Sequence, residues 1–574
     1  MVASHGRLAA LLLLLVVVWF GGLGHRKLIK PDEGRYAEIP REMVASGDWT
    51  TPRLNGLKYF EKPPLQYWAT AVAYEAFGAS EATSRLWTAL TGFLGILVVG
   101  FTAARLYDRR TGLFASTVLA SCVAYVLLGH FNTLDMGLAF FMTTTLCATL
   151  LARDARARAA GHGDHCGASP DALATQARRW MLLGWAALAL ATLSKGPVAV
   201  VLSGGALVFY LLLSRDWTLL RSLVLVRGLA LYLLITAPWF LAVSKANPEF
   251  AHFFFIHEHV ERFLTTEHRR EGPLWYFVPV LAVGLLPWLS LVVASFSTTF
   301  SPSTRGAFAP ERLLVAWCAV IFVFFSLSGS KLPSYVLPMF PALALLVARH
   351  LARIDARALR RHLVAIVALA GLVCLVVLAL PRFMDSADTA EAVGRFRVAA
   401  LIAMGTWLVG SGVALRFAWR GRIDAAIVTT GFAALVAWSG LLIGHETLGR
   451  GMSTADLAAQ MKPAIEPDTT IYSIGIFEHT LDFYLARTVT LVSFRDELDF
   501  GLTQEPARGI ATIDEFKRRW AAERAPLAIM SRDVFDTLVA SHLPLRVIAD
   551  DRRRIVIGKP VEASTAPSGT TSPP

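Results

Sequence analysis

Apolar segments long enough to cross a lipid bilayer recur along this chain of 574 residues, from Leu8 to Gly444. The hydrocarbon core of a bilayer is about 30 Å thick, and a helix of roughly 20 apolar residues crosses it. Only 17% of the residues are charged, whereas soluble proteins carry about 25%. The chain is therefore predicted to be a polytopic α-helical membrane protein. Its net charge of +12 is assigned mainly to arginine at the ends of spans, which argues against nucleic-acid binding.

Thirteen membrane spans are expected. They are predicted at 8–25, 84–106, 111–128, 136–152, 180–194, 198–214, 228–244, 274–297, 312–328, 333–350, 362–380, 396–418 and 424–444. The first is kept as a span, not a cleaved signal peptide, because no good small-residue cleavage site precedes the charged loop. The segment 65–78 is too short to cross and is predicted to be an interfacial helix. The transmembrane domain is expected over 1–445, with its chemistry in two outer loops, 26–83 and 245–273.

Arginine marks one set of connecting loops, from which lysine is nearly absent. These arginines are Arg105, Arg109, Arg110, Arg153, Arg156, Arg158, Arg178, Arg179, Arg215, Arg221, Arg227, Arg349, Arg353, Arg357, Arg360, Arg361, Arg416, Arg420 and Arg422. All of these loops fall on one side of a thirteen-span protein, and the positive-inside rule makes that side cytoplasmic. Arg26, Lys27 and Lys30 follow the first span and argue the reverse locally. The agreement among the later loops decides the orientation, with the first loop outside.

The composition changes after the last span, where strand-like and helical segments alternate over 446–562. Strands are predicted at 470–475, 488–494, 527–530, 546–548 and 554–557, and helices at 453–461, 477–486, 513–524 and 532–540. This alternation is typical of a small α/β domain with a mostly parallel sheet. The odd number of spans puts this domain outside, and the tail 563–574 is predicted to be disordered from its composition.

The first outer loop, 31–64, concentrates charged and aromatic residues directly after the first span. A loop of this length is usually functional. Pro63 and Pro64 fix two backbone angles and disfavour helix before them, so Glu61 and Lys62 are expected to be extended. Any one of these charges is equally consistent with a solvated loop, but the set as a whole predicts a site.

Shorter connections on the same side place ionisable groups at the membrane boundary. They are Asp135 after 130–134, Lys195 in 194–197 and Lys331 in 329–335. Charge at such a place is costly and usually functional, although a single lysine there is also explained by snorkelling to the interface. Because these groups share a face with Asp32 and Lys62, the sequence predicts one polar cavity.

Six motifs on this face are informative together. They are Asp32-Glu33 followed by Arg35-Tyr36, Tyr59-Phe60-Glu61-Lys62-Pro63-Pro64, Ser84-Arg85-Leu86, Leu134-Asp135, Ser194-Lys195-Gly196-Pro197 and Lys331-Leu332-Pro333-Ser334-Tyr335. The chain thereby resembles the lipid-linked sugar transferases of the GT-C class. Within that class it is similar to the bacterial aminoarabinose transferases of lipid A, which are relatives of the protein O-mannosyltransferases. The resemblance covers the membrane domain and the small periplasmic domain after it.

The resemblance implies an inverting glycosyltransferase that moves 4-amino-4-deoxy-L-arabinose from undecaprenyl phosphate to a lipid A phosphate. It implies a multi-pass protein of the bacterial inner membrane, with its active site and C-terminal domain in the periplasm. It also implies a role in resistance to polymyxin and other cationic peptides. The implied partners are the undecaprenyl-linked sugar, lipid A and membrane lipids, and a monomer is expected.

Roles for individual residues follow from the resemblance and from the charge of the donor. The candidate catalytic residues are Asp32, Lys195, Asp135 and Glu33; the candidate donor-phosphate ligands are Lys62, Arg262, Arg35 and Lys331; and the candidate sugar and lipid pocket consists of Tyr36, Tyr59 and Tyr335. A monophosphate leaving group carries compact charge that cations can hold directly, without magnesium. Asp32 is expected to pair with Lys195, to orient the acceptor or to recognise the sugar amine.

Metal binding is open at this stage, and no cofactor is expected to be required. The second outer loop holds His252, His257, His259 and His268. A structural zinc on Glu61 and His257 is one interpretation, and interfacial histidines without a metal are the other. The spacing of His257 and His259 suits ligation less well than a helical i, i+4 spacing. The five cysteines form neither a metal spacing nor an evident disulfide pair and are treated as small core residues.

Two other functions fit the sequence. A lipid transporter or flippase would also have many spans and charge near the membrane. However, no inverted repeat is visible, and the polar groups gather at one face instead of the mid-membrane. The second alternative is a transferase of the same class with another sugar or with a protein acceptor.

Overall fold

The computed structural model describes residues 2–160, 169–261, 272–299, 308–379 and 387–560. The chain divides into two compact units. The helical unit comprises Met1–Lys27, Met43–Pro52 and Phe60–Gly449, and the sheet unit comprises Leu28–Glu42, Arg53–Tyr59 and Arg450–Pro574. The first outer loop is thus shared between the units, which the sequence analysis did not anticipate.

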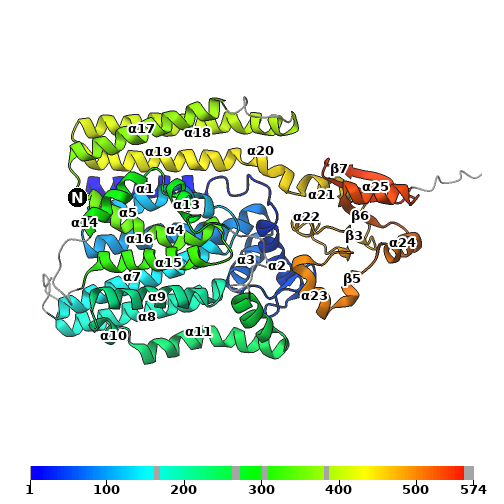
Figure 1. Cartoon of the computed structure of the whole chain (residues 1–574), viewed down its shortest axis with the longest axis horizontal. Coiled ribbons are helices and arrows are strands. Elements are labelled where there is room, and N and C mark those ends of the chain that lie inside the picture. The colour runs from blue at the N-terminus through cyan, green and yellow to red at the C-terminus, as the bar shows by residue number, and fades with distance from the viewer. Residues whose placement is uncertain (1, 161–168, 262–271, 300–307, 380–386, 561–574) are drawn as a thin grey trace, which may run out of the picture. The chain divides into compact units, whose positions relative to one another are not determined.

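The helical unit is a bundle of long helices with short connections (Figure 1). Its α-helices are α1 (Val2–Phe20), α3 (Leu65–Phe77), α4 (Glu81–Leu106), α5 (Arg109–Ser121), α6 (Val123–Leu128), α7 (Asp135–Ala159), α8 (Pro170–Lys195), α9 (Val198–Ser214), α10 (Thr218–Ser222), α11 (Leu225–Ala246), α13 (Phe277–Gly284), α14 (Leu289–Thr299), α15 (Pro310–Leu327), α16 (Phe340–Leu351), α17 (Ala356–Ala379), α18 (Ala387–Trp419), α19 (Ile423–Gly444) and α20 (Glu446–Gly449). A π-helix, η1 (His252–Glu261), follows α11, and a 3-10 helix, η2 (Pro333–Met339), precedes α16. Each predicted span coincides with a helix or with two consecutive helices, and the short segment 65–78 is the helix α3.

Eight helices of the described part are long and apolar enough to cross a membrane, or nine with one bent pair. The bent pair is α13 and α14, which meet at 111° around Pro287. Proline has no N–H to donate, so a helix breaks readily there. The predicted span 111–128 is also interrupted, between α5 and α6, where Cys122 has an extended backbone. The prediction of a polytopic helical protein is confirmed, while a count of thirteen includes helices that are shorter, broken or more polar.

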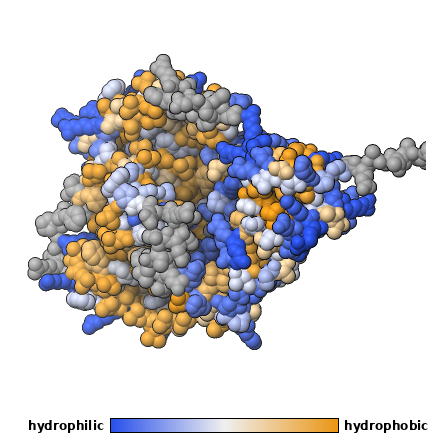
Figure 2. All heavy atoms as spheres, turned by 45° about the vertical axis from the view of Figure 1, so that its right-hand side comes forward, coloured by the Kyte–Doolittle hydropathy of each residue, from blue (hydrophilic) through white to orange (hydrophobic). Residues whose placement is uncertain are grey.

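Large apolar side chains cover much of the outer surface of the helical unit, as the orange areas of Figure 2 show. Val226 and Leu234 on α11, Leu375 on α17 and Ile402 on α18 are all more than half exposed. An apolar surface of this extent is not stable in water and marks a membrane interface. Inside the bundle, aromatic side chains such as Trp288 are fully buried.

Contacts between loops show that the arginine-rich connections lie at one end of the bundle. The Tyr107 hydroxyl after α4 donates to Glu311 at the start of α15 (3.2 Å), and Arg349 at the end of α16 pairs with the same carboxylate (3.0 Å). Arg110 pairs with Asp424 at the start of α19 (2.7 Å). These loops were predicted to lie on one side of the membrane, and the contacts agree with that arrangement.

Arg153 extends this cluster to the remaining arginine-rich loops. Arg153 lies near the C-terminal end of α7. It pairs with Asp216 of the loop after α9 at 2.5 Å, and its guanidinium lies over the ring of Phe308 before α15. Both partners of the ion pair are buried, so the loops are held together rather than merely facing the same way. The polar groups Asp135, Lys195 and Lys331 belong to the other set of connections.

The sheet unit is built on a mixed six-stranded sheet in the order β5-β4-β3-β6-β8-β7. The strands are β3 (Ile471–Ile474), β4 (Thr490–Val492), β5 (Gly509–Ile510), β6 (Leu527–Ser531), β7 (Arg546–Asp550) and β8 (Arg554–Gly558). Three pairings are parallel and the two that involve β8 are antiparallel. Five of the strands match the predicted ones, and the short β5 was not predicted. The helices include α21 (Ala455–Met461), α22 (Leu481–Leu485), α23 (Asp499–Gln504), α24 (Ile513–Ala522) and α25 (Arg532–Ala540).

Two pieces of the first outer loop are part of the sheet unit. They are the start of helix α2 (Asp32–Ser46) and a hairpin of β1 (Arg53–Leu54) and β2 (Leu57–Lys58). The Asn55 side chain in the hairpin exchanges two hydrogen bonds with the backbone of Val489 (2.9 and 2.7 Å). Gly34 is required on α2 because a Cβ there would lie 2.5 Å from the His479 carbonyl oxygen. The loop therefore has a fixed structure, which its charge did not suggest.

Ion pairs also connect these pieces to the rest of the sheet unit. The pairs are Lys30–Glu478, Arg35–Glu497 and Arg53–Glu505. In each, the basic residue comes from the loop and the acid from the C-terminal part. Glu478 is itself buried and is shared with Arg554 on β8 at 2.8 Å, so the loop is attached to the core of the unit.

A buried acidic cluster lies where α2 meets α22 within the sheet unit. Glu38 accepts two hydrogen bonds from Arg41 (2.7 and 2.5 Å), and Glu42 accepts the Gly56 N–H with both oxygens (2.9 and 3.1 Å). Asp482 on α22 is fully buried against them. Burial, and then repulsion from Glu38, raises the pKa of Glu42 to about 8. Burial likewise raises the pKa of Asp482 well above its ordinary value. Glu42 therefore holds a proton at neutral pH.

Candidate functional site

A cavity of about 280 Å³ opens in the helical unit among the connections that the sequence analysis had grouped on one face. It is lined by Lys62, Asp135, Leu138, Lys195, Pro197, Val198, Val201, Leu202, Glu258, Phe324, Phe325, Ser328, Ser330, Ser334, Tyr335 and Pro338. These residues come from the first loop, α7, α8, α9, η1, α15 and η2. Of the groups expected in one polar cavity, Lys62, Asp135 and Lys195 line this one, whereas Asp32 and Lys331 are not among its lining residues.

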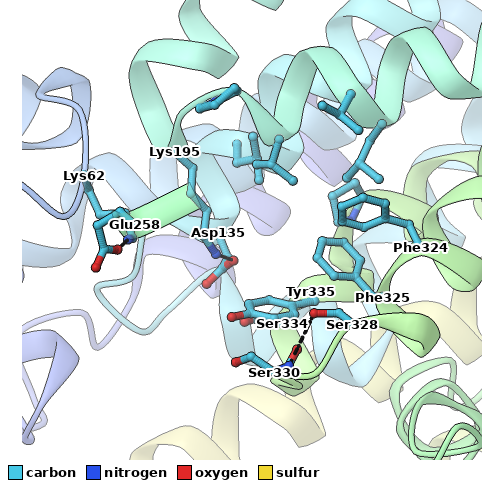
Figure 3. A pocket seen from close by; sticks show the side chains of 16 residues that line it. Lys62, Asp135, Lys195, Glu258, Phe324, Phe325, Ser328, Ser330, Ser334 and Tyr335 are labelled. Atoms are coloured by element: carbon cyan, nitrogen blue, oxygen red, sulfur yellow. Dashed lines mark hydrogen bonds and ion pairs between the residues drawn. The ribbon is translucent and has the colours of Figure 1, made fainter. Parts of the chain in front are cut away.

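Lys62 and Glu258 form an ion pair at one side of the cavity, as Figure 3 shows. Lys62 Nζ lies 3.1 Å from Glu258 Oε2 and donates to the Glu61 carbonyl at 2.8 Å. The side chain of Lys62 is 13% exposed and that of Glu258 only 4%. Pro63 and Pro64 follow Lys62 and stiffen its backbone before α3 begins at Leu65. The lysine is thus presented from a rigid segment.

Asp135 and Lys195 form a second ion pair in the middle of the cavity (Figure 3). Asp135 is the first residue of α7 and Lys195 the last of α8. Helix dipoles favour an acid at the first position and a base at the last, so both charges are stabilised where they stand. Lys195 Nζ also lies 5.0 Å from the ring centroid of Tyr335, within the range of a cation–π contact.

Aromatic and aliphatic side chains form the opposite part of the cavity. Phe324 and Phe325 near the end of α15 (Figure 3) line the cavity together with Val198 and Val201 of α9, and the ring centroids of Phe325 and Tyr335 are 4.8 Å apart. One side of the cavity thus suits a charged head group and the other an alkyl or isoprenoid chain.

The backbone turn after α15 provides polar groups between these two parts. Lys331 Nζ donates to the Ser328 carbonyl at 2.6 Å and is 7% exposed. Ser328 Oγ donates to the Ser330 carbonyl at 3.1 Å. Lys331 is not among the lining residues, and its hydrogen bond to Ser328 holds the turn that brings Ser328, Ser330 and Ser334 to the cavity.

Seven of the predicted site residues that the structure describes belong to the helical unit. Lys62, Asp135, Lys195 and Tyr335 line the cavity, and Lys331 supports its wall. Glu61 lies beside Lys62, with 3.9 Å between its carboxylate and the ammonium, and His257 precedes Glu258 on η1.

The other predicted residues are distributed differently. Asp32, Glu33, Arg35, Tyr36 and Tyr59 belong to the sheet unit, and Arg262 lies outside the described residues. Arg35 pairs with Glu497 and lies near the rings of Tyr36 and Tyr59. Their assigned roles stay predictions.

Lys195 pairs with Asp135, a partner that was not predicted for it, and Asp32 lies 3.8 Å from Arg35. A pair between Asp32 and Lys195, which belong to different units, stays a prediction. The physical reason for the pair with Asp135 is local. Asp135 and Lys195 are at adjoining ends of two helices that pack along their length, so their meeting requires no long-range placement.

The zinc interpretation is not tested by the described residues. Among them, no group of three or more histidine, cysteine or acidic side chains is placed to hold a metal ion. His268 and the side chain of His259 are outside that description. A zinc on Glu61 and His257 stays a prediction.

Sequence reasoning missed Glu258 and the three serines. Glu258 is the acidic residue in the run from Phe253 to Val260, and attention to its histidine neighbours hid it. A carboxylate among aromatic residues at a membrane boundary is itself a signal, because such a charge requires a partner.

Comparisons with known proteins agree with this arrangement. Residues 7–254 match the family described as dolichyl-phosphate-mannose-protein mannosyltransferase. Residues 457–559 match the aminoarabinose transferase C-terminal domain.

Individual relatives match over different lengths. An undecaprenyl phosphate-α-4-amino-4-deoxy-L-arabinose arabinosyl transferase of Sodalis glossinidius is 30% identical over 95% of this chain and 97% of its own length. The protein of that name from Erwinia tasmaniensis is 32% identical, over 57% of this chain and 56% of its own length. The crystal structure of ArnT from Cupriavidus metallidurans bound to undecaprenyl phosphate superimposes with a TM-score of 0.89, at 38% identity. That match covers 97% of this chain and 98% of the other.

Proposed function

The chain belongs to the undecaprenyl phosphate-α-4-amino-4-deoxy-L-arabinose arabinosyl transferase family, and from that premise we propose that it glycosylates lipid A. It transfers 4-amino-4-deoxy-L-arabinose from undecaprenyl phosphate to a lipid A phosphate at the periplasmic face of the inner membrane. The observation that carries the proposal is the cavity, which combines two lysine–carboxylate pairs with an aromatic and aliphatic wall.

The division of the cavity fits the two parts of the donor. The isoprenoid chain lies along Phe324, Phe325 and Val201, where it is shielded from water. The phosphate lies at the polar side, within reach of Lys62 and Lys195. Ammonium groups stabilise a phosphate directly by charge-assisted hydrogen bonds.

The reaction breaks the bond between C1 of the sugar and the donor phosphate oxygen. A lipid A phosphate oxygen forms the new bond to C1 from the opposite face, which inverts the configuration. Undecaprenyl phosphate leaves with one more negative charge than it had in the diester, and the acceptor phosphate loses one. The lysines oppose charge where it develops, which is the most effective place for electrostatic stabilisation.

Asp135 has a positioning role in this scheme. It holds the Lys195 ammonium at the cavity by pairing with it. A phosphate acceptor is already ionised near neutral pH, so the reaction needs little help from a general base. Glu61 and His257 do not take part in these steps.

The function is tested with the purified full-length protein in lipid vesicles, supplied with the undecaprenyl-linked aminopentose and lipid A. Mass spectrometry of the lipid A is expected to show addition of the aminopentose with the wild type and none with Lys62→Ala. Unmodified lipid A with the active wild-type preparation, or transfer to a protein instead, would overturn the proposal. Movement of the donor between leaflets without transfer would favour a flippase.

Lys62→Arg sharpens this test. It retains the positive charge but replaces a point charge with a planar fork of donors. Partial activity with Lys62→Arg and none with Lys62→Ala is expected if the charge itself binds the phosphate. Thr70→Val is the matched control, because Thr70 is buried on α3 and does not line the cavity.

A further inference from the structure

Ser330 carries a hydroxyl that its own turn does not use. The turn joins α15 to η2, and Ser330 is one of the residues that line the cavity. Among the residues that the structure describes, none pairs with its Oγ, although neighbouring atoms shield that oxygen from water. A buried hydroxyl without a hydrogen bond is unfavourable. This hydroxyl is therefore suited to bind a group that enters the cavity.

Two other polar side chains of this turn are already engaged within it. Ser328 Oγ donates to the Ser330 carbonyl at 3.1 Å and accepts the Ser330 N–H at 3.3 Å (Figure 3). The Lys331 ammonium donates to the Ser328 carbonyl at 2.6 Å. These bonds fix the backbone of Ser330 and leave its side chain out. A serine side chain turns among three staggered positions, and here the rotation breaks no hydrogen bond to the described residues.

The place of Ser330 in the cavity indicates which group it meets. Tyr335, five residues further along, contacts both parts of the cavity. Its ring centroid is 4.8 Å from that of Phe325 on the apolar side and 5.0 Å from the Lys195 ammonium on the polar side. The turn thus lies at the boundary between the two parts. The proposed donor has the order isoprenoid chain, phosphate, sugar, so its phosphate reaches this boundary when the chain lies along the apolar wall.

A neutral hydroxyl suits this phosphate before and after transfer. It donates a hydrogen bond to a phosphate oxygen without adding charge to the cavity. Hydrogen bonds to a charged group are stronger than those between neutral groups. The leaving phosphate gains a negative charge during transfer, so the bond strengthens as the reaction proceeds.

We infer that the Ser330 hydroxyl binds the phosphate of the undecaprenyl-linked donor and stabilises it as the leaving group. This role rests on the proposed function, in which undecaprenyl phosphate leaves. No proton is transferred. Ser330 stays a hydrogen-bond donor while the bond between C1 and the phosphate oxygen breaks, and the electron pair of that bond goes to the phosphate.

Equilibrium binding tests this role without any transfer. The full-length protein is titrated with undecaprenyl phosphate and, separately, with undecaprenol, which has the same chain and no phosphate. Ser330→Ala is expected to raise the Kd for undecaprenyl phosphate about tenfold or more and to leave the Kd for undecaprenol unchanged. Ser330→Thr keeps the hydroxyl and is expected to retain most of the affinity. In the vesicle assay, Ser330→Ala is expected to lower kcat as well as to raise KM, because the leaving phosphate gains charge.

Ser326→Ala is the matched control. Ser326 also has a buried hydroxyl without a partner among the described residues, but it lies on α15 and does not line the cavity. This variant is expected to bind both lipids like the wild type.

An unchanged Kd for undecaprenyl phosphate in Ser330→Ala would overturn the inference, and so would an equal rise in Ser326→Ala. A higher KM for the sugar-linked donor with unchanged binding of undecaprenyl phosphate would put the hydroxyl on the sugar, which also overturns it. If Ser330→Ala weakens this binding as expected but the wild type transfers no aminopentose, phosphate binding by Ser330 is supported and the proposed function alone fails.

Discussion

Gln66 Nε2 donates a hydrogen bond to Asn132 Oδ1 at 2.7 Å, and both side chains are almost completely buried. Gln66 is on the first turn of α3, four residues after Lys62, and Asn132 is three residues before Asp135. One buried amide pair thus connects the segment that presents Lys62 with the turn that presents Asp135. The turn is also fixed from its other side, because His130 contacts the carbonyls of Trp19 and Val126 at 2.6 Å each.

We predict that this amide pair sets the spacing of the two ion pairs of the cavity. Gln66→Asn shortens one side chain by a methylene and Asn132→Gln lengthens the other. Each single change is expected to lower kcat about tenfold, because small misplacements of binding groups have large effects on rate. The double swap restores the combined length and is expected to recover most of the activity. Losses that simply multiply in the double swap would contradict the prediction.

A second prediction concerns the ion pair of Lys195 with Asp135. Lys195→Met and Asp135→Asn are each expected to reduce transfer strongly, since each leaves the other charge uncompensated in a largely buried site. The double variant is expected to be no worse than the poorer single variant, because residues in one ion pair are not independent. Asp32→Asn combined with Lys195→Met serves as the comparison, and its two losses are expected to multiply. Initial rates in vesicles provide the measurement, and independence of Asp135 and Lys195 would refute the pairing.

The contrast between Asp32 and Asp135 shows how far sequence reasoning reaches. The spans and the two sets of loops were predictable, because apolar length and arginine placement report on membrane crossing directly. Their shared side grouped Asp32, Lys62, Asp135, Lys195 and Lys331 in one predicted cavity, and three of these line the observed one: Lys62, Asp135 and Lys195. Which carboxylate meets which lysine depends on helix packing, and a single sequence does not contain that information.

The first outer loop shows the opposite limitation. Its charges predicted a site, but residues 32–42 and 53–59 are built into the sheet unit as a helix and a hairpin. The α2 sequence contains Pro40 and little apolar surface, so no helical period was visible in it. The helix is stabilised by tertiary contacts such as Arg35–Glu497, and these come from residues more than 400 positions away.

The buried acids of the sheet unit predict a dependence of stability on pH. The pKa of Glu42 is raised from 4.5 to about 8 in the folded protein, so the folded state holds a proton that the unfolded state releases. Between these two values the folded state binds more protons, and stability therefore falls as the pH rises. Above about pH 8 the Glu42 carboxyl is ionised in both states, and the stability that the bound proton contributed is fully lost. The groups that face Glu42 include Glu38, Arg41, Asp482 and the Gly56 N–H.

Thermal unfolding of the full-length protein in detergent tests this dependence. For the wild type, Tm is expected to decrease from pH 5 to pH 8. The free energy of unfolding is expected to fall by up to about 1.4 kcal/mol per pH unit for one such group. Glu42→Gln is always neutral, and its Tm is expected to change less over the same range. Glu515→Gln, which removes a surface carboxylate on α24, is expected to behave like the wild type. A Glu42→Gln profile as steep as that of the wild type would show that this carboxyl is not the one that titrates.

The final prediction concerns the side of the membrane on which the cavity opens. Tyr107, Arg110 and Arg153 gather the arginine-rich loops at one end of the helical unit, and the positive-inside rule makes that end cytoplasmic. An undecaprenyl-linked donor and lipid A then meet at the other end, where no nucleotide sugar is available. The energy of transfer comes from the phosphoester of the donor, so no nucleotide is consumed.

Single cysteines test this orientation in a background without the five native cysteines. Ser541→Cys is exposed in the sheet unit, and Arg420→Cys is exposed between α18 and α19. In intact spheroplasts, a membrane-impermeant maleimide is expected to label position 541 and not position 420. After the membrane is permeabilised, both positions are expected to react, which controls for accessibility. Labelling of position 420 alone in intact spheroplasts would put the cavity in the cytoplasm, and transfer to lipid A in the periplasmic leaflet would then have to be abandoned.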